Sequence, residues 1–163
     1  MKRSVFVILI LLVSGCAGYF FYWRSDRRQV KILVEKMVEL AAKEYSKLPH
    51  EGILKFAGSD KVFADPVEIY SETPHFTRTL NKEECRNMLA FLHRQVQFLT
   101  VKTDDLQLKI SGEMAYFVFD AELSAGFRNG SKTREILLVR GRAVKTSAGW
   151  RIAAVTAEPV LKR

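Results

Sequence analysis

The residue with the clearest potential for chemistry is Asp65, an acid within an apolar segment that is typical of a β-strand. Strand alternation places its side chain on the same face as Phe63, Val67 and Ile69. Burial among apolar side chains disfavours the charged form, which raises the pKa of a carboxyl group toward the strength that a general base needs. Asp65 is therefore our candidate catalytic residue, acting by removal of a proton from a substrate.

The residue that follows, Pro66, supports a structural interpretation of the same acid. Proline has no amide hydrogen to donate to a sheet, so Pro66 requires an edge position or a bulge, and a bulge would turn the carboxylate in another direction. An Asp-Pro pair at a strand bend can also cap a local turn through the Asp side chain. We favour this structural role for Asp65 over the catalytic one.

Two further acids, Asp120 and Glu122, lie on one side of a second apolar strand segment. A two-residue hairpin at Asn129-Gly130 would place Asp120 opposite Val139 and Glu122 opposite Leu137. Both carboxylates then point to the same side of the sheet.

If Trp150, Ile152 and Ala154 are the inward set of the last predicted strand, Asp120 and Glu122 point into the same concavity. The two acids then form a polar spot in an apolar ligand-binding pocket beside Trp150. The alternative, which we favour, is that the two acids lie toward the rim and form exposed ion pairs, which contribute little to stability. Their candidate partners are Arg134, Arg140 and Arg142.

The remaining residues that bind metals or act as nucleophiles do not form a motif. His50, His75 and His93 are scattered, and no HxxxH, HExxH, CxxC, Walker or GxGxxG pattern occurs. We expect His93 to be an exposed or half-buried helix residue, and Cys85 to be a small buried apolar residue. No metal and no cofactor is expected.

The length of 163 residues suits one domain with a terminal extension. The formal charge is +8, but residues 1–31 hold six basic residues and one Asp, or +5 of it. The +3 that remains makes the folded part only mildly basic, which argues against nucleic acid as a partner.

Residues 4–23 contain no charge, and 20 residues are about what an α-helix needs to cross a bilayer. The segment ends in Tyr19-Phe20-Phe21-Tyr22-Trp23-Arg24, an aromatic and basic composition that is typical of a bilayer interface. We therefore predict a membrane anchor in residues 1–24 and one domain in residues 25–163, close to the bilayer.

A different anchor is also compatible with these residues. Val13-Ser14-Gly15-Cys16 resembles a bacterial lipobox, in which Cys16 would be lipidated and become the new N-terminus. We favour the single-pass helix, because aromatic residues directly after a lipidated Cys are unusual. Both interpretations place the protein at a membrane. The basic residues on the two sides of the helix, counted alone, would place the domain in the cytoplasm, whereas a lipoprotein would place it outside, so the side stays open.

Downstream, apolar residues at steps of three and four predict a helix over residues 30–48 and another from Asn81 to about residue 99. Asn81 followed by Glu84 fits a helix N-cap. A short helix is predicted at residues 50–57, a strand at residues 61–70 and an irregular hairpin after it.

The last third of the chain predicts a strand at residues 105–111 and three more strands between residues 113 and 159, joined by tight hairpins. Helices followed by a run of strands indicate an α+β fold, with helices packed on one face of an antiparallel sheet.

The element order, Val62-Phe63-Ala64-Asp65-Pro66-Val67, the helix start after residue 80 and the final Gly149-Trp150-Arg151-Ile152 strand resemble the nuclear transport factor 2-like superfamily, in its SnoaL-like and ketosteroid isomerase-like branches. The resemblance implies a cystatin-like cone: a curved sheet wrapped around two or three helices, enclosing an apolar pocket. It also implies that a homodimer through the outer sheet face is a candidate assembly.

In ketosteroid isomerases a general-base Asp precedes a Pro, and Asp65 matches it. Their oxyanion partners are a Tyr on the first helix, for which Tyr45 is the candidate, and a protonated Asp on the strand that here begins with Leu138-Val139-Arg140-Gly141, where no acid occurs. A base without its electrophile has little catalytic power. We therefore expect a membrane-tethered, non-enzymatic domain that binds a small apolar ligand or a protein partner, with an isomerase or dehydratase as the alternative.

Overall fold

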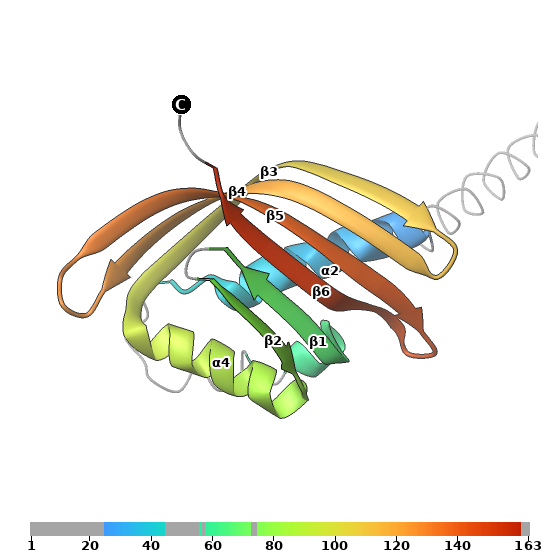
Figure 1. Ribbon diagram of the computed structural model, residues 1–163, viewed down its shortest axis with the longest axis horizontal. Coiled ribbons are helices and arrows are strands. Elements are labelled where there is room, and N and C mark those ends of the chain that lie inside the picture. Colours follow the sequence, from blue (N-terminus) through green and yellow to red (C-terminus); the bar gives the residue numbers. More distant parts are fainter. Residues whose placement is uncertain (1–24, 45–55, 57, 73–74, 161–163) are drawn as a thin grey trace, which may run out of the picture.

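The computed structural model describes residues 25–44, 56, 58–72 and 75–160, drawn in colour in Figure 1. Its helices and strands are α2 (Asp26–Ala41), η1 (Ser59–Lys61), β1 (Phe63–Ser71), β2 (Phe76–Leu80), α4 (Lys82–Gln95), β3 (Val96–Ser111), β4 (Met114–Phe127), β5 (Lys132–Thr146) and β6 (Gly149–Pro159).

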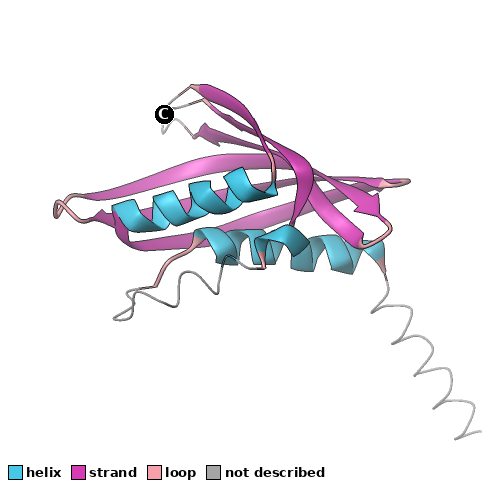
Figure 2. Cartoon of the chain, turned by 90° about the horizontal axis from the view of Figure 1, so that it is seen from below, coloured by secondary structure: helices cyan, strands magenta, loops and turns pink. Residues whose placement is uncertain are grey.

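The six strands form one curved sheet in the order β2-β1-β6-β5-β4-β3, and α2 lies along its concave face (Figure 1). Side chains from α2, α4 and the inner face of the sheet form one hydrophobic core, and Figure 2 shows how the two helices lie against the sheet. Alternate residues of β4 are buried because a strand presents every second side chain to one face. The expected α+β cone of a curved sheet around helices is confirmed.

One strand pair differs from the expected antiparallel pattern. β1 and β6 lie side by side and run parallel, whereas the other neighbouring strands are antiparallel. Short turns force consecutive strands to be antiparallel, but β1 and β6 are separated by most of the chain, so no turn dictates their relative direction. The prediction of a wholly antiparallel sheet was wrong for this pair.

α2 begins at the N-cap Ser25 and ends at Ala41, earlier than the predicted end at residue 48. Its buried side chains follow the expected apolar stripe, with Val30, Leu33 and Val34 among them. The backbone of Lys43 leaves the helix and forms two 2.8 Å hydrogen bonds with the backbone of Leu99 in β3. Pairing with a distant strand therefore ends the helix where the periodic pattern alone would continue it.

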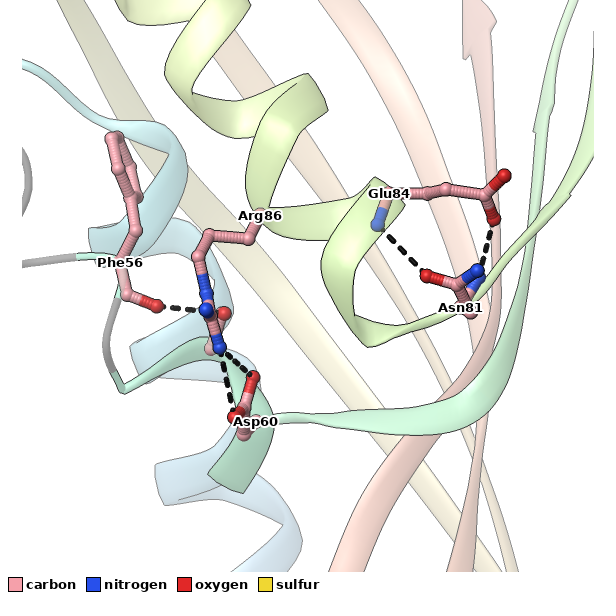
Figure 3. A network of polar contacts seen from close by, with 6 residues as sticks. Phe56, Asp60, Asn81, Glu84 and Arg86 are labelled. Carbon is pink, nitrogen blue, oxygen red and sulfur yellow. Dashed lines mark hydrogen bonds and ion pairs between the residues drawn. The ribbon is translucent and has the colours of Figure 1, made fainter.

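α4 begins where the sequence predicts. Asn81 Oδ1 accepts a hydrogen bond from the Glu84 amide at 2.9 Å, and Glu84 Oε2 accepts one from the Asn81 amide at 2.8 Å, as Figure 3 shows. This capping box satisfies amides that the first helical turn leaves without partners. One turn further, Arg86 Nη2 donates to both carboxylate oxygens of Asp60 at 3.0 Å, which ties α4 to η1.

The C-terminal end of α4 was predicted too late. The helix stops at Gln95, and Val96 begins β3. Val96 and Leu99 are nevertheless buried, in a small second cluster with Ala125. A shift in the pairing of β3 with β4 after Val96 lets strand residues three apart face the same way, which imitates a helical period.

The hairpin between β4 and β5 has a loop of three residues, 128–130, where we predicted two. Phe127 N donates to Ser131 O at 2.9 Å, and Gly130 has φ of +87°, a conformation that favours glycine. The extra loop residue shifts the pairing by one position. Asp120 consequently faces Leu138 and Glu122 faces Ile136, and the predicted partners Val139 and Leu137 were wrong.

Candidate functional site

One polar cluster lies at the edge of the core, where the first turn of α2 meets the hairpin between β5 and β6. The Trp150 indole is only 3% exposed, and its Nε1 donates a hydrogen bond to Asp26 Oδ1 at 3.0 Å. Lys145 Nζ donates to both oxygens of the same carboxylate, at 2.9 and 3.0 Å. Lys145 and Trp150, near the end of the domain, thus share the carboxylate of Asp26, at its start.

The hydrogen bonds from Lys145 and then from Trp150 lower the pKa of Asp26, against a smaller opposing effect of burial. A carboxylate that two donors hold in its charged form is a poor proton acceptor, so the cluster is suited to fixing α2 against the hairpin. Sequence reasoning counted Asp26 only as a charge. The residue that could have indicated this contact in the sequence is Trp150, because a buried indole N–H needs a hydrogen-bond acceptor.

The inner face of the sheet beside this cluster is filled by aromatic and aliphatic side chains. Phe117 and Ile152 are almost completely buried, and the Phe117 ring stacks near Phe119 with centroids 6.1 Å apart. The Phe117 ring also covers Gly141 so closely that a Cβ at position 141 would lie 2.1 Å from Phe117 Cζ. Trp150, a predicted ligand-binding residue, lies in this packed core.

Asp65 does not have the environment on which the general-base hypothesis depends. Its side chain is exposed, although Phe63 and Val67 on the same strand are buried. The pairing of β1 with β6 is interrupted between Phe63 and Glu68, and the Asp65-Pro66 peptide bond is cis. The predicted burial of Asp65 was therefore wrong, because the irregular pairing between Phe63 and Glu68 breaks the alternation.

Asp120 and Glu122 lie on the outer face of the sheet, on the side opposite to Phe117 and Phe119. Asp120 is exposed, and Glu122 Oε1 lies 2.8 Å from Arg134 Nη2. This ion pair is the rim arrangement that we favoured for Glu122. The structure thus does not bring these acids together with Trp150 in one concavity.

The other two arginines considered as partners bind different acids. Arg140 Nη1 lies 2.7 Å from Glu158 Oε2, and Arg142 Nη2 lies 3.7 Å from Glu68 Oε2. The first pair joins the neighbouring strands β5 and β6, and the second reaches from β5 across β6 to β1. Both lie at partly exposed positions, where ion pairs add little stability.

Comparison with solved structures identifies the architecture. A protein from Novosphingobium aromaticivorans proposed to be an aromatic ring hydroxylase matches with a TM-score of 0.70 and 9% identity, covering 84% of this chain and 90% of that one. A Streptomyces avermitilis protein proposed to be a dehydratase of the nuclear transport factor 2-like family matches with a TM-score of 0.62 and 15% identity, covering 84% and 97%.

A second Novosphingobium aromaticivorans protein, described as nuclear transport factor 2-like with a cystatin-like fold, has a TM-score of 0.61 and 12% identity, with 92% and 91% of the chains covered. This chain has the nuclear transport factor 2-like fold. No protein-family model and no curated protein matches its sequence. At identities of 9 to 15%, the similarity shows the fold alone, and any chemistry has to be inferred from the residues of the site.

The resemblance to ketosteroid isomerases would require a second acid on β5. In this nuclear transport factor 2-like fold, β5 instead carries Arg140, which faces outward, and Gly141, which lies under the Phe117 ring.

Tyr45, the other expected oxyanion partner, lies outside the described residues. The same holds for Cys16, for the whole segment 1–24 and for nearly all of the short helix predicted at residues 50–57. Among the described helices, none has the length and apolar character that a membrane span requires.

His93 is a buried residue, which corrects the expectation of an exposed or half-buried one. Its Nε2 donates to the Ala41 carbonyl oxygen at 3.0 Å, and its ring meets Phe56 edge-on with centroids 4.7 Å apart. Lys43 Nζ donates to the carbonyl oxygens of His93 and Val96, at 2.6 and 2.7 Å, and burial lowers the pKa of this lysine. These contacts join the last turns of α2 and α4, a role that depends on packing and that periodicity did not reveal.

Cys85 is a buried member of the core, as we expected. Burial, with a contribution from the Asp60 charge, raises the pKa of its thiol to about 11. The thiol is therefore protonated at neutral pH and is a poor nucleophile. No group of three or more His, Cys, Asp or Glu side chains within the described residues is arranged to hold a metal ion.

Proposed function

We propose that this chain is a membrane-tethered binding domain without catalytic activity. Residues 1–24 hold it at a bilayer, and its nuclear transport factor 2-like domain, residues 25–163, binds a protein partner. The observation that carries the proposal is the exposure of Asp65, the one acid that matches a catalytic position. An exposed carboxylate lacks the desolvation that raises a general base to useful strength.

The outer sheet face is the surface that we assign to the partner. Half-buried apolar side chains there, Val118, Ile136 and Leu138, lie between partly exposed ion pairs. An apolar centre inside a polar rim is the usual anatomy of a protein interface. A second copy of this chain is the simplest occupant, because one patch then serves both subunits.

A small apolar ligand on the inner face is less favoured as the bound partner. Such a ligand needs an enclosed apolar pocket, and the Phe117 ring takes the space over Gly141, while Trp150 and Ile152 are themselves buried in the core.

The alternative function is an enzyme of the isomerase or dehydratase type that uses Asp65 as its general base. It is supported by the fold, and by similar structures proposed to be a dehydratase and an aromatic ring hydroxylase. Substrate binding would have to bury Asp65 and supply the missing electrophile.

The Asp65→Asn variant of the full chain separates the two functions, with Glu72→Gln as a matched control at another exposed acid of the same region. We expect no turnover of unsaturated ketones or hydroxyketones by any of the three proteins. We also expect stability changes within about 0.5 kcal/mol, because Asp65 is exposed and exposed substitutions rarely cost more. A loss of about 1 to 3 kcal/mol in Asp65→Asn alone would instead support the turn-capping role that the sequence favours. Turnover that is present in the parent chain and lost only in Asp65→Asn would establish the enzyme.

The partner face is tested by the mass of the full chain in detergent, measured by light scattering. Leu138→Glu places a charge in the proposed interface and should shift a dimer toward the monomer, because unpaired buried charge is costly. Thr77→Glu, on the exposed part of β2, is the control and should leave the mass unchanged. A monomeric parent chain would exclude the homodimer.

A further inference from the structure

Three parts of the chain meet at one end of the domain. Met114 pairs with Val144, the Lys145 amide donates to the Glu113 carbonyl oxygen at 2.8 Å, and the Lys145 side chain reaches Asp26. The tips of the β3–β4 and β5–β6 hairpins therefore lie beside the first turn of α2, as Figure 1 shows. We call this region the hairpin end.

The hairpin end exposes two large apolar side chains on the outer face of β4. Met114 is 41% exposed and Tyr116 is 43% exposed, and the Tyr116 hydroxyl lies 3.7 Å from Met114 Sδ. Tyrosine has an apolar ring and a polar tip, so it is well suited to the boundary between water and lipid.

Cations lie at this end on both faces of the sheet. On the outer face, Lys109 lies directly opposite Tyr116 on β3 and is exposed. On the other side, Arg27 and Lys31 are exposed on the first two turns of α2, which packs against the concave face. Lys145 compensates the charge of Asp26, and Lys31 Nζ lies 3.9 Å from Glu35 Oε1 in an exposed pair. Glu113 is an exposed acid beside the β3–β4 turn, against the exposed Arg27 and Lys109. The charge of the hairpin end is thus positive, and complementary to an anionic surface.

The position of the uncharged segment limits how far this end can be from a bilayer. Only two residues, Arg24 and Ser25, separate Trp23 from Asp26, so the start of α2 lies within about 10 Å of the end of that segment along the chain. The polar head-group layer of one leaflet is of similar depth, roughly 5 to 8 Å. If residues 4–23 cross the membrane, the hairpin end is the part of the domain that meets the head groups.

We propose that the hairpin end is a second membrane contact, with Met114 and Tyr116 inserted at the interface and Lys109, Arg27 and Lys31 bound to anionic head groups. The inference rests on the proposed membrane tether and deepens it. The domain is then held in one orientation, with the far end of the sheet and α4 directed away from the bilayer.

The test is hydroxyl-radical labelling of the full chain, incorporated as one copy per lipid nanodisc and read by mass spectrometry. Two nanodisc types are compared, phosphatidylcholine alone and phosphatidylcholine with phosphatidylglycerol. Phe91 is the internal control. It is 57% exposed and lies two residues before His93, which contacts the last turn of α2, about 22 Å along the helix from Asp26.

We expect labelling of Met114 and Tyr116 to fall roughly threefold or more in anionic nanodiscs relative to neutral ones, because cationic residues near a surface favour anionic lipid. Labelling of Phe91 should be the same in both. The combined variant Arg27→Ser, Lys31→Ser and Lys109→Ser should lose the lipid dependence. Lys132→Ser, in the hairpin at the opposite tip of the sheet, should retain it.

Equal labelling of Met114 and Tyr116 in the two lipids would overturn the inference while leaving the tether intact. Protection that develops only when two copies share a nanodisc would assign these side chains to a dimer and would also overturn it. A chain that fails to enter nanodiscs at all would refute the tether, and the second contact with it.

Discussion

The Trp150 indole and the Asp26 carboxylate, 124 positions apart in the sequence, are joined by a 3.0 Å hydrogen bond. This contact closes the last hairpin onto the start of α2, directly after the segment that we predict to be in the membrane.

Trp150→Phe and Asp26→Ala should each lower the free energy of unfolding by about 1 kcal/mol, because each removes one partner of a partly buried hydrogen bond. The double variant should cost less than both single changes together, since the second substitution has no bond left to break. Thermal unfolding of the full chain in detergent, followed by near-ultraviolet circular dichroism, measures the coupling. Strict additivity would show that the bond contributes nothing.

Acid should destabilise the domain through Asp26. Its pKa in the folded state lies below the ordinary value of 3.8, so its stabilising effect is complete above that value and is lost as pH falls through the folded-state pKa. Asp26→Asn should lose less stability than the parent chain between about pH 5 and about pH 3. The difference should be modest, because the Asp26 side chain is 34% exposed.

Asp120→Asn is the control for this pH series, because Asp120 is an exposed acid on the outer face of the sheet. Its acid sensitivity should follow that of the parent chain. If Asp26→Asn and Asp120→Asn change the pH dependence of the unfolding free energy equally, the Asp26, Lys145 and Trp150 cluster makes no specific contribution to acid unfolding.

Gly141→Ala should destabilise the domain by about 1 to 3 kcal/mol, because the added methyl group overlaps the Phe117 ring and forces the core to shift. Combining it with Phe117→Leu should recover part of the loss, although the nearby Ala154 carbonyl oxygen still crowds the methyl group. Melting temperatures of the parent chain and of these two variants decide the question. If Gly141→Ala leaves the melting temperature unchanged, the space above residue 141 is open, and this result would favour a small ligand bound there.

The membrane tether is tested by fractionation of cells that express either the full chain or a chain beginning at Ser25. We expect only the full chain in the membrane fraction, because residues 4–23 are long enough to cross the hydrocarbon core. Equal solubility of the two would contradict the prediction.

The kind of anchor is decided by Cys16→Ser. A spanning helix should tolerate this change, and metabolic labelling with fatty acid should be negative both before and after it. Labelling that depends on Cys16 would identify a lipoprotein in place of the single-pass helix.

The features that the sequence predicted correctly depend on residues close together in the chain. Asn81 and Glu84 are three residues apart, and a capping box needs nothing beyond that spacing. The last three strands and their turns follow from apolar runs separated by glycine, which supplies positive φ where the chain reverses. The α+β class could be predicted because such local elements leave few ways to build one core.

What only the tertiary structure decided depends on contacts between distant residues. The exposure of Asp65 follows from how β1 pairs with β6, and the end of α2 follows from the pairing of Lys43 with Leu99. His93 is buried because two helix ends meet. A local pattern determines which side chains share a face, whereas burial is set by the partner that covers the face, and the energy of distant packing exceeds the small propensities that a sequence displays.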